Sequence, residues 1–245
     1  MGKCLDGLLM KNQYFGDIND YKKYGLLRIL SNEAAIKIGV CWMLTDVDKK
    51  NDGKFIDYLN KPAQWRIFDP PLFDSLKNCF TKPQNRNILL AQTSNIIPSA
   101  VFYNNLLSDN SLERQHYFNQ FLSDAAACQL IFFDPDNGLE TKSKPYGKKG
   151  SHKYLYWHEI LSTFKAGHSI LFYQHFPRTK RAEFISEMAK DLSSRSGSEV
   201  ISFRTSNVVF MLISQRHHLS YFQHRSDVVS KTWSSKIEIT HHYSR

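Results

Sequence analysis

Residues 129–140, Gln-Leu-Ile-Phe-Phe-Asp-Pro-Asp-Asn-Gly-Leu-Glu, decide the fold. The first five form an almost wholly apolar run, which is typical of a strand buried on both faces of a sheet. The run ends at Asp134-Pro135, where the proline fixes its own φ and pushes Asp134 toward an extended conformation. The stretch therefore predicts a buried strand that delivers a carboxylate to one edge of a sheet. Asp-Pro-Asp-Asn-Gly is also good turn chemistry, so a purely structural turn is the alternative.

Short apolar runs alternate with amphipathic stretches on both sides of this strand. We expect further strands at 36–44, 66–68, 87–92, 169–173, 200–203 and 208–213, and helices at 17–30, 55–59, 72–79, 112–127, 154–164 and 181–192. Asp17 is the expected N-cap of the first helix. This alternation predicts a single α/β domain over residues 1–245, with room for a small insertion around 94–127. The expected architecture is a Rossmann-like, mostly parallel sheet with helices on both faces and an antiparallel C-terminal strand pair.

Composition limits the class of protein. The 245 residues are 42% hydrophobic and 22% charged, which argues against a wholly disordered chain. No run approaches the ~18 apolar residues of a membrane span, so we expect no membrane contact and a cytoplasmic location. The four cysteines form no Cys-x-x-Cys pair, so the sequence predicts neither a structural metal site nor a disulfide framework.

Positive charge is concentrated in two places along the chain. The net charge is +9, from 32 Lys+Arg against 23 Asp+Glu. Residues 142–153 hold five lysines and no acid, together with a proline and two glycines, which predicts a loop. A second group begins at Arg178, just after the expected strand 169–173. Basic loops interleaved with aromatic residues suit phosphate contact and base stacking, so RNA or DNA is the expected partner. A solvated loop that only keeps the protein in solution is the alternative.

The segment Gly16-Asp17-Ile18-Asn19-Asp20-Tyr21-Lys22-Lys23-Tyr24 resembles a known pattern. It is similar to the Gly-Asn-x-Ala-Asp-x-x-Lys-His segment of bacterial ribosomal-RNA adenine-N6 methyltransferases, which are Rossmann-fold enzymes. Strand 129–133 followed by Asp134-Pro135 resembles the Asp/Asn-Pro-Pro-aromatic motif of this class. Residues 173–177, Tyr-Gln-His-Phe-Pro, fall where the family carries an aromatic-Pro segment.

The resemblance implies transfer of a methyl group from S-adenosylmethionine to a base amine. Asp134 and the Pro135 carbonyl would accept hydrogen bonds from that amine, with Asn137 in the same motif. The residues implied at the cofactor are Asp20, Lys23, Thr45, Asp46 and, at a ribose diol, Asp69. Those implied at the substrate are Lys142, Lys144, Lys148, Lys149, Tyr173, His175 and Arg178.

Two other functions stay open. Residues 45–53, where the family's cofactor loop would lie, contain one glycine, and the motif at 134–137 lacks the aromatic residue that stacks on a flipped base. Tyr146 or Tyr173 would have to replace it. These departures favour a non-catalytic nucleic-acid-binding protein on a degenerate Rossmann scaffold. Asp136, Glu140 and Lys142 also echo the carboxylate and lysine pattern of magnesium-dependent nucleases.

Overall fold

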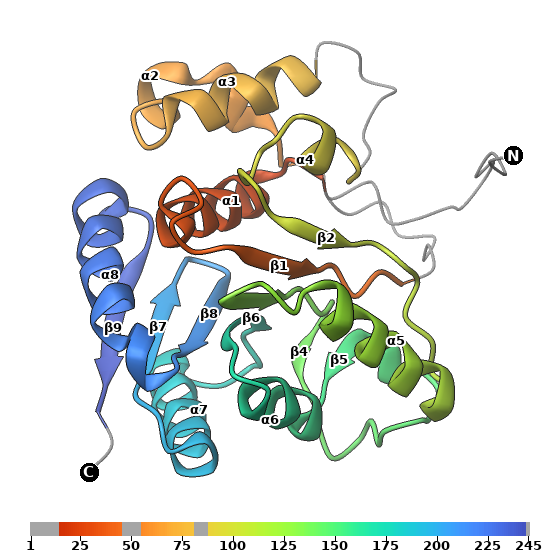
Figure 1. Ribbon diagram of the computed structural model, residues 1–245. Coiled ribbons are helices and arrows are strands. Elements are labelled where there is room, and N and C mark those ends of the chain that lie inside the picture. Colours follow the sequence, from red (N-terminus) through yellow and green to blue (C-terminus); the bar gives the residue numbers. More distant parts are fainter. Residues whose placement is uncertain (1–14, 46–54, 81–87, 244–245) are drawn as a thin grey trace, which may run out of the picture.

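A seven-stranded sheet forms the centre of the computed structural model, which describes residues 15–45, 55–80 and 88–243 (Figure 1). The strands lie in the order β2 (Val101–Tyr103), β1 (Ile38–Cys41), β3 (Leu130–Phe133), β6 (Ser169–His175), β8 (Val208–Ile213), β7 (Val200–Arg204) and β9 (Glu238–His242). The first four are parallel, and β8 is antiparallel to both β6 and β7. The predicted α/β fold, with a mostly parallel sheet and a C-terminal antiparallel pair, is confirmed.

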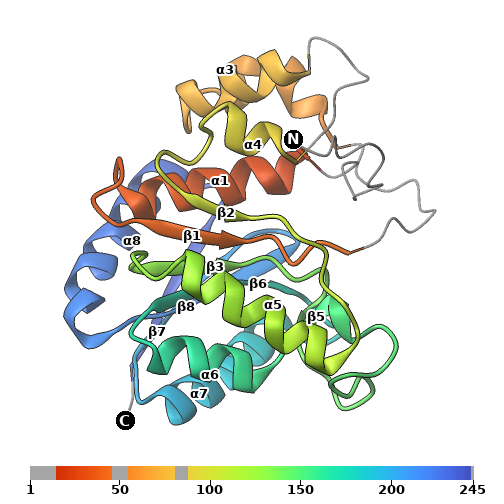
Figure 2. The ribbon, with the colours of Figure 1, turned by 45° about the vertical axis from the view of Figure 1, so that its right-hand side comes forward.

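Helices cover both faces of the sheet. The longer ones are α1 (Ile18–Ser31), α3 (Pro70–Cys79), α5 (Ser111–Asp124), α6 (Trp157–Lys165), α7 (Arg181–Ser196) and α8 (Leu219–Trp233). Apolar side chains of α1 and α8 form one core with Val40 and Phe132, whereas α5, α6 and α7 form a second core with Phe133 on the other face. In Figure 2, α3 and the short α4 (Leu90–Thr93) lie outside α1. In the described ranges no helix has both the length and the apolar character needed to span a bilayer.

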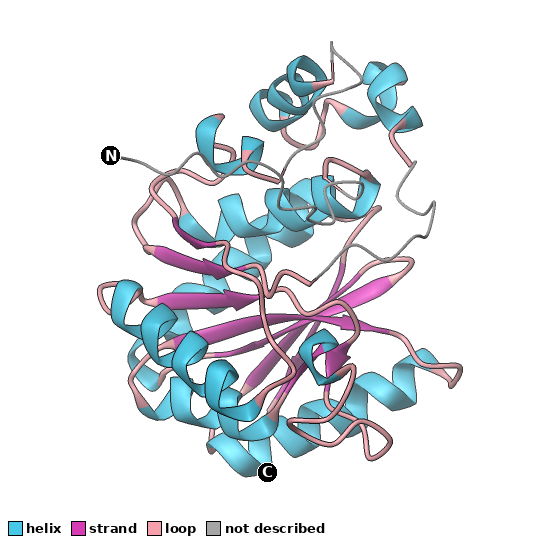
Figure 3. Cartoon of the chain, turned by 90° about the vertical axis from the view of Figure 1, so that its right-hand side faces the viewer, coloured by secondary structure: helices cyan, strands magenta, loops and turns pink. Residues whose placement is uncertain are grey.

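The order of the strands creates a switch point between β1 and β3. From β1 the chain moves to β2 on one side, then returns across β1 to β3 and onward to β6. Cys41 at the end of β1 pairs in register with Phe133 at the end of β3, and the next amide, that of Asp134, donates to the Cys41 carbonyl at 3.0 Å. Ligands of doubly wound sheets bind outside the carboxyl ends of the strands at such a point. Figure 3 views the sheet from the side toward which β1 and β2 point in Figure 1.

Two predicted strands are wrong. Residues 66–68 follow α2 (Pro62–Trp65) in a turn and lead into α3, because Pro62 starts one helix and Pro70 and Pro71 start the other. The described part of 87–92 begins at residue 88 and contains the start of α4. Its short apolar run fits a buried helix as well as a strand, so periodicity alone misassigns it.

Several other boundaries shift. The helix expected at 154–164 begins at Trp157, after the two-residue strand β5 (Tyr154–Leu155), which pairs with β4 (Gly138–Leu139). The stretch 55–59 overlaps a 3-10 helix, Asp57–Asn60. Residues 94–127 supply edge strand β2 and helix α5, so they contribute to the sheet and to one helix layer.

Gly25 is the contact point between α1 and α8. A Cβ atom at this position would overlap the indole ring of Trp233, which is fully buried and stacks on Phe68 with ring centroids 5.0 Å apart. Gly25→Ala improves helix propensity by about 1 kcal/mol, but overpacking costs roughly 1–3 kcal/mol. We therefore expect a lower free energy of unfolding in urea denaturation. Ser186→Ala, on the exposed face of α7, is the control and should cause no loss. A more stable Gly25→Ala protein would contradict this close packing.

Candidate functional site

The start of α1 places an acid and a lysine on the same face. Gly16 has a φ of +74°, and Asp17 then caps the helix by accepting hydrogen bonds from the amides of Asn19 at 2.7 Å and Asp20 at 2.9 Å. The predicted N-cap is thereby confirmed. Asp20 in turn accepts a hydrogen bond from the Gly16 amide at 2.9 Å. Residues three apart on a helix are neighbours, so Asp20 and Lys23 lie side by side.

Lys23 joins α1 to the end of β3. Its Nζ lies 2.8 Å from Asp20 Oδ1 and 2.7 Å from Asp134 Oδ2. The three side chains are 8%, 10% and 15% exposed, so this double ion pair is nearly buried. The ammonium group also lies 5.2 Å from the centre of the Trp42 ring. Lys23 thus brings together two carboxylates that are far apart in the sequence.

We call Asp17, Asp20, Lys23 and Asp134 the Lys23 cluster, and its carboxylates outnumber its lysine. Burial, together with the charge of Asp20, raises the pKa of Asp17 to about 6. Burial also raises the pKa of Asp134 to about 6, although Lys23 acts in the opposite direction. For Lys23 burial opposes the charge, but attraction to Asp134 and Asp20 outweighs it and raises the pKa of the lysine. Three carboxylates around one ammonium leave an excess of negative charge above pH 6.

Asp134 keeps one oxygen for another partner. Oδ2 is bonded to Lys23, whereas Oδ1 makes no hydrogen bond within the described part of the chain and is not a fully buried atom. The half-buried ring of Tyr173, from β6, lies near this carboxylate. Burial and the negative charge of Asp134 raise the pKa of the Tyr173 hydroxyl, which lies 3.0 Å from Nε2 of the exposed His175. An approaching N–H group would find a free acceptor at Asp134 beside an aromatic ring.

The loops after β1 and β3 are tied to each other. The hydroxyl of Thr45 donates to Asp136 Oδ2 at 3.0 Å. Two residues earlier, Met43 has a φ of +48°, in the left-handed region that non-glycine residues adopt at a cost. The structure thus brings Thr45 to the motif that holds Asp134. Asp46, predicted at the cofactor, lies outside the described residues.

Gly138 determines how the chain leaves the Asp-Pro-Asp-Asn segment and enters β4. Its φ is +101°, and a Cβ would overlap the side-chain amide of Gln174, whose Oε1 accepts a hydrogen bond from the Leu139 amide at 2.7 Å. Pro135 is buried, and the Asn137 amide donates to the Lys153 carbonyl at 3.0 Å. The Asp-Pro-Asp-Asn-Gly stretch therefore links β3 to β4 and places Asp134 at the carboxyl end of β3.

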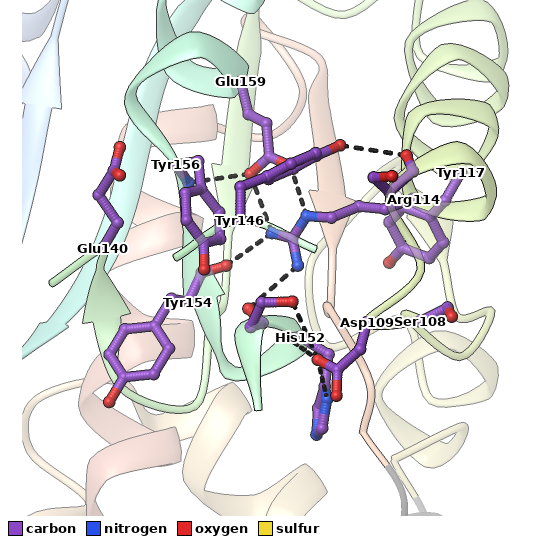
Figure 4. A network of polar contacts seen from close by, with 12 residues as sticks. Ser108, Asp109, Arg114, Tyr117, Glu140, Tyr146, His152, Tyr154, Tyr156 and Glu159 are labelled. Atoms are coloured by element: carbon purple, nitrogen blue, oxygen red, sulfur yellow. Dashed lines mark hydrogen bonds and ion pairs between the residues drawn. The ribbon is translucent and has the colours of Figure 1, made fainter. Parts of the chain in front are cut away.

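The basic loop, residues 142–153, is held by a buried arginine (Figure 4). Arg114, from α5, is fully buried and binds both oxygens of Glu159 at 2.6 and 2.9 Å. It also donates to the carbonyls of Ser151 at 3.1 Å and Tyr154 at 2.6 Å. The end of the loop is therefore fixed to α5 and α6. The four lysines predicted at the substrate lie exposed on this loop: Lys142, Lys144, Lys148 and Lys149.

A second acid fixes the same end of the loop. Asp109 accepts hydrogen bonds from the amides of Gly150 and His152, both at 2.7 Å. Partial burial opposes ionisation of this carboxyl, but these hydrogen bonds lower the pKa of Asp109 to about 2. Tyr146, half-buried in the loop, packs edge-on against Tyr156 with centroids 5.1 Å apart. Tyr146 is therefore engaged within the loop, and of the two candidate aromatic residues Tyr173 is the one that the charge of Asp134 affects.

The residues of the nuclease pattern have separate contacts. Glu140 Oε1 accepts a hydrogen bond from the Trp157 amide at 2.8 Å, at the start of α6. Asp136 lies with Thr45, and Lys142 is exposed on the basic loop. Within residues 15–45, 55–80 and 88–243, no three His, Cys, Asp or Glu side chains are grouped so that they could hold a metal ion.

Asp69 was predicted to end a strand, but it caps α3 instead. Oδ1 accepts a hydrogen bond from the Leu72 amide at 3.0 Å, and Oδ2 is bonded to Arg28 Nε at 2.7 Å. Both carboxylate oxygens therefore have structural partners, and the described contacts do not connect Asp69 to the Lys23 cluster. Arg178 is exposed in the loop after β6.

Comparisons with known proteins add little. No family model matches the sequence, and no curated protein matches it. Among solved structures, the chain is similar to protein LPL1258 from Legionella pneumophila str. Philadelphia 1, described as family-model DUF519. The identity is 12%, the TM-score is 0.42, and the likeness covers 95% of this chain and 98% of that one. Functional inference therefore rests on the residues of this chain alone.

The Arg114–Glu159 pair can be tested against an exposed pair of the same kind. Arg114→Met leaves the Glu159 carboxylate buried without its partner, which typically costs about 3–5 kcal/mol. We expect that loss in urea denaturation, together with faster trypsin cleavage in the basic loop. Arg66→Met is the matched control, because Arg66 also binds a carboxylate, that of Asp74, with two nitrogens, but on the surface. It should change stability little. Equal losses in the two variants would contradict the structural role of Arg114.

Proposed function

We propose that this protein transfers a methyl group from S-adenosylmethionine to a base amine of RNA or DNA. The observation that carries the proposal is the second oxygen of Asp134, an acceptor without a partner in the described chain, at the switch point of the sheet. Asp20, Lys23 and Asp134, which the sequence resemblance connects to this reaction, meet at that point. Thr45 lies next to the same motif through Asp136.

The charge of the cluster fits this cofactor. S-adenosylmethionine carries a sulfonium and an ammonium group, and both cations suit a site in which two carboxylates bind one lysine and a third, that of Asp17, interacts electrostatically with Asp20 and Lys23. Asp20, Lys23 and Thr45 are the described residues that would hold it, whereas Asp69 is bonded to Arg28 and has no contact with these residues. When bound, the cofactor supplies an electrophilic methyl group.

Asp134 would orient the target amine. Its free oxygen accepts a hydrogen bond from the amine, and Lys23 keeps the carboxylate in place through the other oxygen. Catalysis then depends on alignment and fixed charges. An amine that accepts the methyl group would have to release one proton near Asp134. A carboxylate with a pKa of about 6 is suited to accept that proton and pass it to water.

A nucleic acid would approach from the basic loop. Its exposed lysines carry charge that phosphates neutralise, and the target base must leave its stack to reach Asp134. Tyr173, whose hydroxyl pKa the charge of Asp134 raises, would stack on that base and replace the aromatic residue that the motif lacks. The acidic cluster and the basic loop thus divide the site into a cofactor end and a substrate end.

Calorimetric titration at pH 8 tests cofactor binding directly. We expect saturable binding of S-adenosylmethionine, at least tenfold weaker in Asp20→Asn, since this variant removes a carboxylate charge and with it about 1.4 kcal/mol or more of interaction. Asp74→Asn, in the exposed pair on α3, is the control and should bind like the wild type. Absence of binding at millimolar cofactor would contradict the proposal and favour a non-catalytic binding protein.

Transfer of labelled methyl groups to RNA or DNA should depend on the ionised form of Asp134. Because its pKa is raised to about 6, the carboxylate is present above pH 6 and is lost as the pH falls through that value. We expect the rate to drop about tenfold per pH unit below pH 6, and Asp134→Asn to be inactive at every pH. An active Asp134→Asn protein would contradict the assigned role.

A further inference from the structure

The turn between β7 and β8 gathers side chains from two helices, α1 and α7. Lys22, from α1, points its Nζ to the Ser206 hydroxyl at 3.5 Å, and Arg181, from α7, donates to the Ser206 carbonyl at 2.6 Å. Asn207 donates to the Asn19 side chain at 3.3 Å. We name Lys22, Arg181, Ser206 and Asn207 the β7–β8 turn site.

This site lies at the same edge of the sheet as Asp134. The antiparallel register pairs His175, at the carboxyl end of β6, with Val208, at the start of β8. The turn that precedes Val208 therefore projects from the edge at which β3 delivers Asp134. Lys22 is also the direct chain neighbour of Lys23. The β7–β8 turn site thus lies next to the Lys23 cluster and at the edge that the proposed substrate must cross.

The β7–β8 turn site carries positive charge that the protein does not neutralise. Lys22 is 5% exposed, and burial and the charge of Lys236 both lower its pKa, whereas Asp17 acts to raise it. In the described part of the chain, no carboxylate lies within ion-pair distance of Lys22, Arg181 or Lys236. A nearly buried ammonium without a carboxylate partner is costly, and an anion from outside the chain would relieve that cost.

Ser206 and Asn207 indicate which anion fits. Both are exposed and add a hydroxyl and an amide to the positive groups, and phosphate oxygens accept hydrogen bonds from all of these donors. The basic loop is fixed to α5 and α6 on one face of the sheet, whereas Lys22 comes from α1 on the other. Two positive groups therefore flank the edge that holds Asp134. Because the two groups are held by helices on opposite faces of the sheet, a chain of phosphates suits them better than a single phosphate.

We propose that the β7–β8 turn site binds phosphates in the backbone of a single-stranded nucleic acid whose target base lies at Asp134. The proposal rests on the proposed function and adds a second phosphate contact to the one at the basic loop. A single strand fits because its bases are free to turn toward Asp134 while the backbone stays on the flanking charges.

Fluorescence anisotropy of labelled single-stranded RNA and DNA of about 12 nucleotides tests the proposal. Arg181→Gln and Ser206→Ala alter exposed residues, and Lys22→Gln alters the nearly buried one. We expect roughly fivefold weaker binding in Arg181→Gln and Lys22→Gln, with the slope of log K against log salt smaller by about 0.7 for each lost phosphate. Lys165→Gln is the matched control, because this exposed lysine ends α6 near the opposite edge of the sheet. It should bind like the wild type.

Three outcomes separate the claims. Unchanged affinity and unchanged salt slope in Arg181→Gln would overturn the proposal, whatever Lys22→Gln does to folding. Tight binding of inorganic phosphate alone, lost in Arg181→Gln, would also overturn it, because the β7–β8 turn site would then serve free phosphate. Weaker oligonucleotide binding in Arg181→Gln, in a protein that binds no S-adenosylmethionine, would support the β7–β8 turn site and contradict methyl transfer.

Discussion

The bridge of Lys23 between Asp20 and Asp134 is the interaction on which the site depends. It connects the first turns of α1 to the end of β3 across a nearly buried space. Burying three charges is expensive, and well-packed apolar residues in such a place are often about 1–4 kcal/mol more stable. Stability alone therefore does not explain the bridge. It does explain how one carboxylate is held in a fixed direction at the switch point, with an oxygen left for a ligand.

The charge of the residues around that bridge has the opposite sign to the net charge of the whole protein. The chain carries a net +9, yet the group of Asp17, Asp20, Lys23 and Asp134 is negative. Positive residues lie on both flanks, in the basic loop and at the β7–β8 turn site. If the proposed cofactor and substrate bind here, this arrangement separates the cationic one from the polyanionic one by electrostatics, and a uniform positive surface would not.

The sequence predicts local features of this site well. The apolar run predicts strand 129–133, and Pro135 favours an extended conformation for Asp134. The Asp17 cap and the i, i+3 spacing of Asp20 and Lys23 are equally readable, because both follow from helix geometry. These elements need only neighbouring residues to define them.

Contacts between distant residues could not be predicted in the same way. Nothing near Arg114 indicates that it binds Glu159 and the end of the basic loop, because that pairing follows from how α5 packs against α6. The strand expected at 66–68 failed because the prolines on either side start helices, a local signal that outweighs a short apolar run. Lys22 and Ser206 were missed because their meeting depends on the sheet order.

The titration of the Asp134 carboxyl tests the central claim most directly. Carbon NMR of aspartate-labelled protein, with Asp134→Asn to assign the signal, measures its pKa in the wild type and in Lys23→Met. We predict a value of about 6 in the wild type and a higher one in Lys23→Met, because that variant loses the positive charge that favours the ionised form. A value near the ordinary 3.8 in both proteins would show that Asp134 is neither buried nor bridged, and would contradict the account.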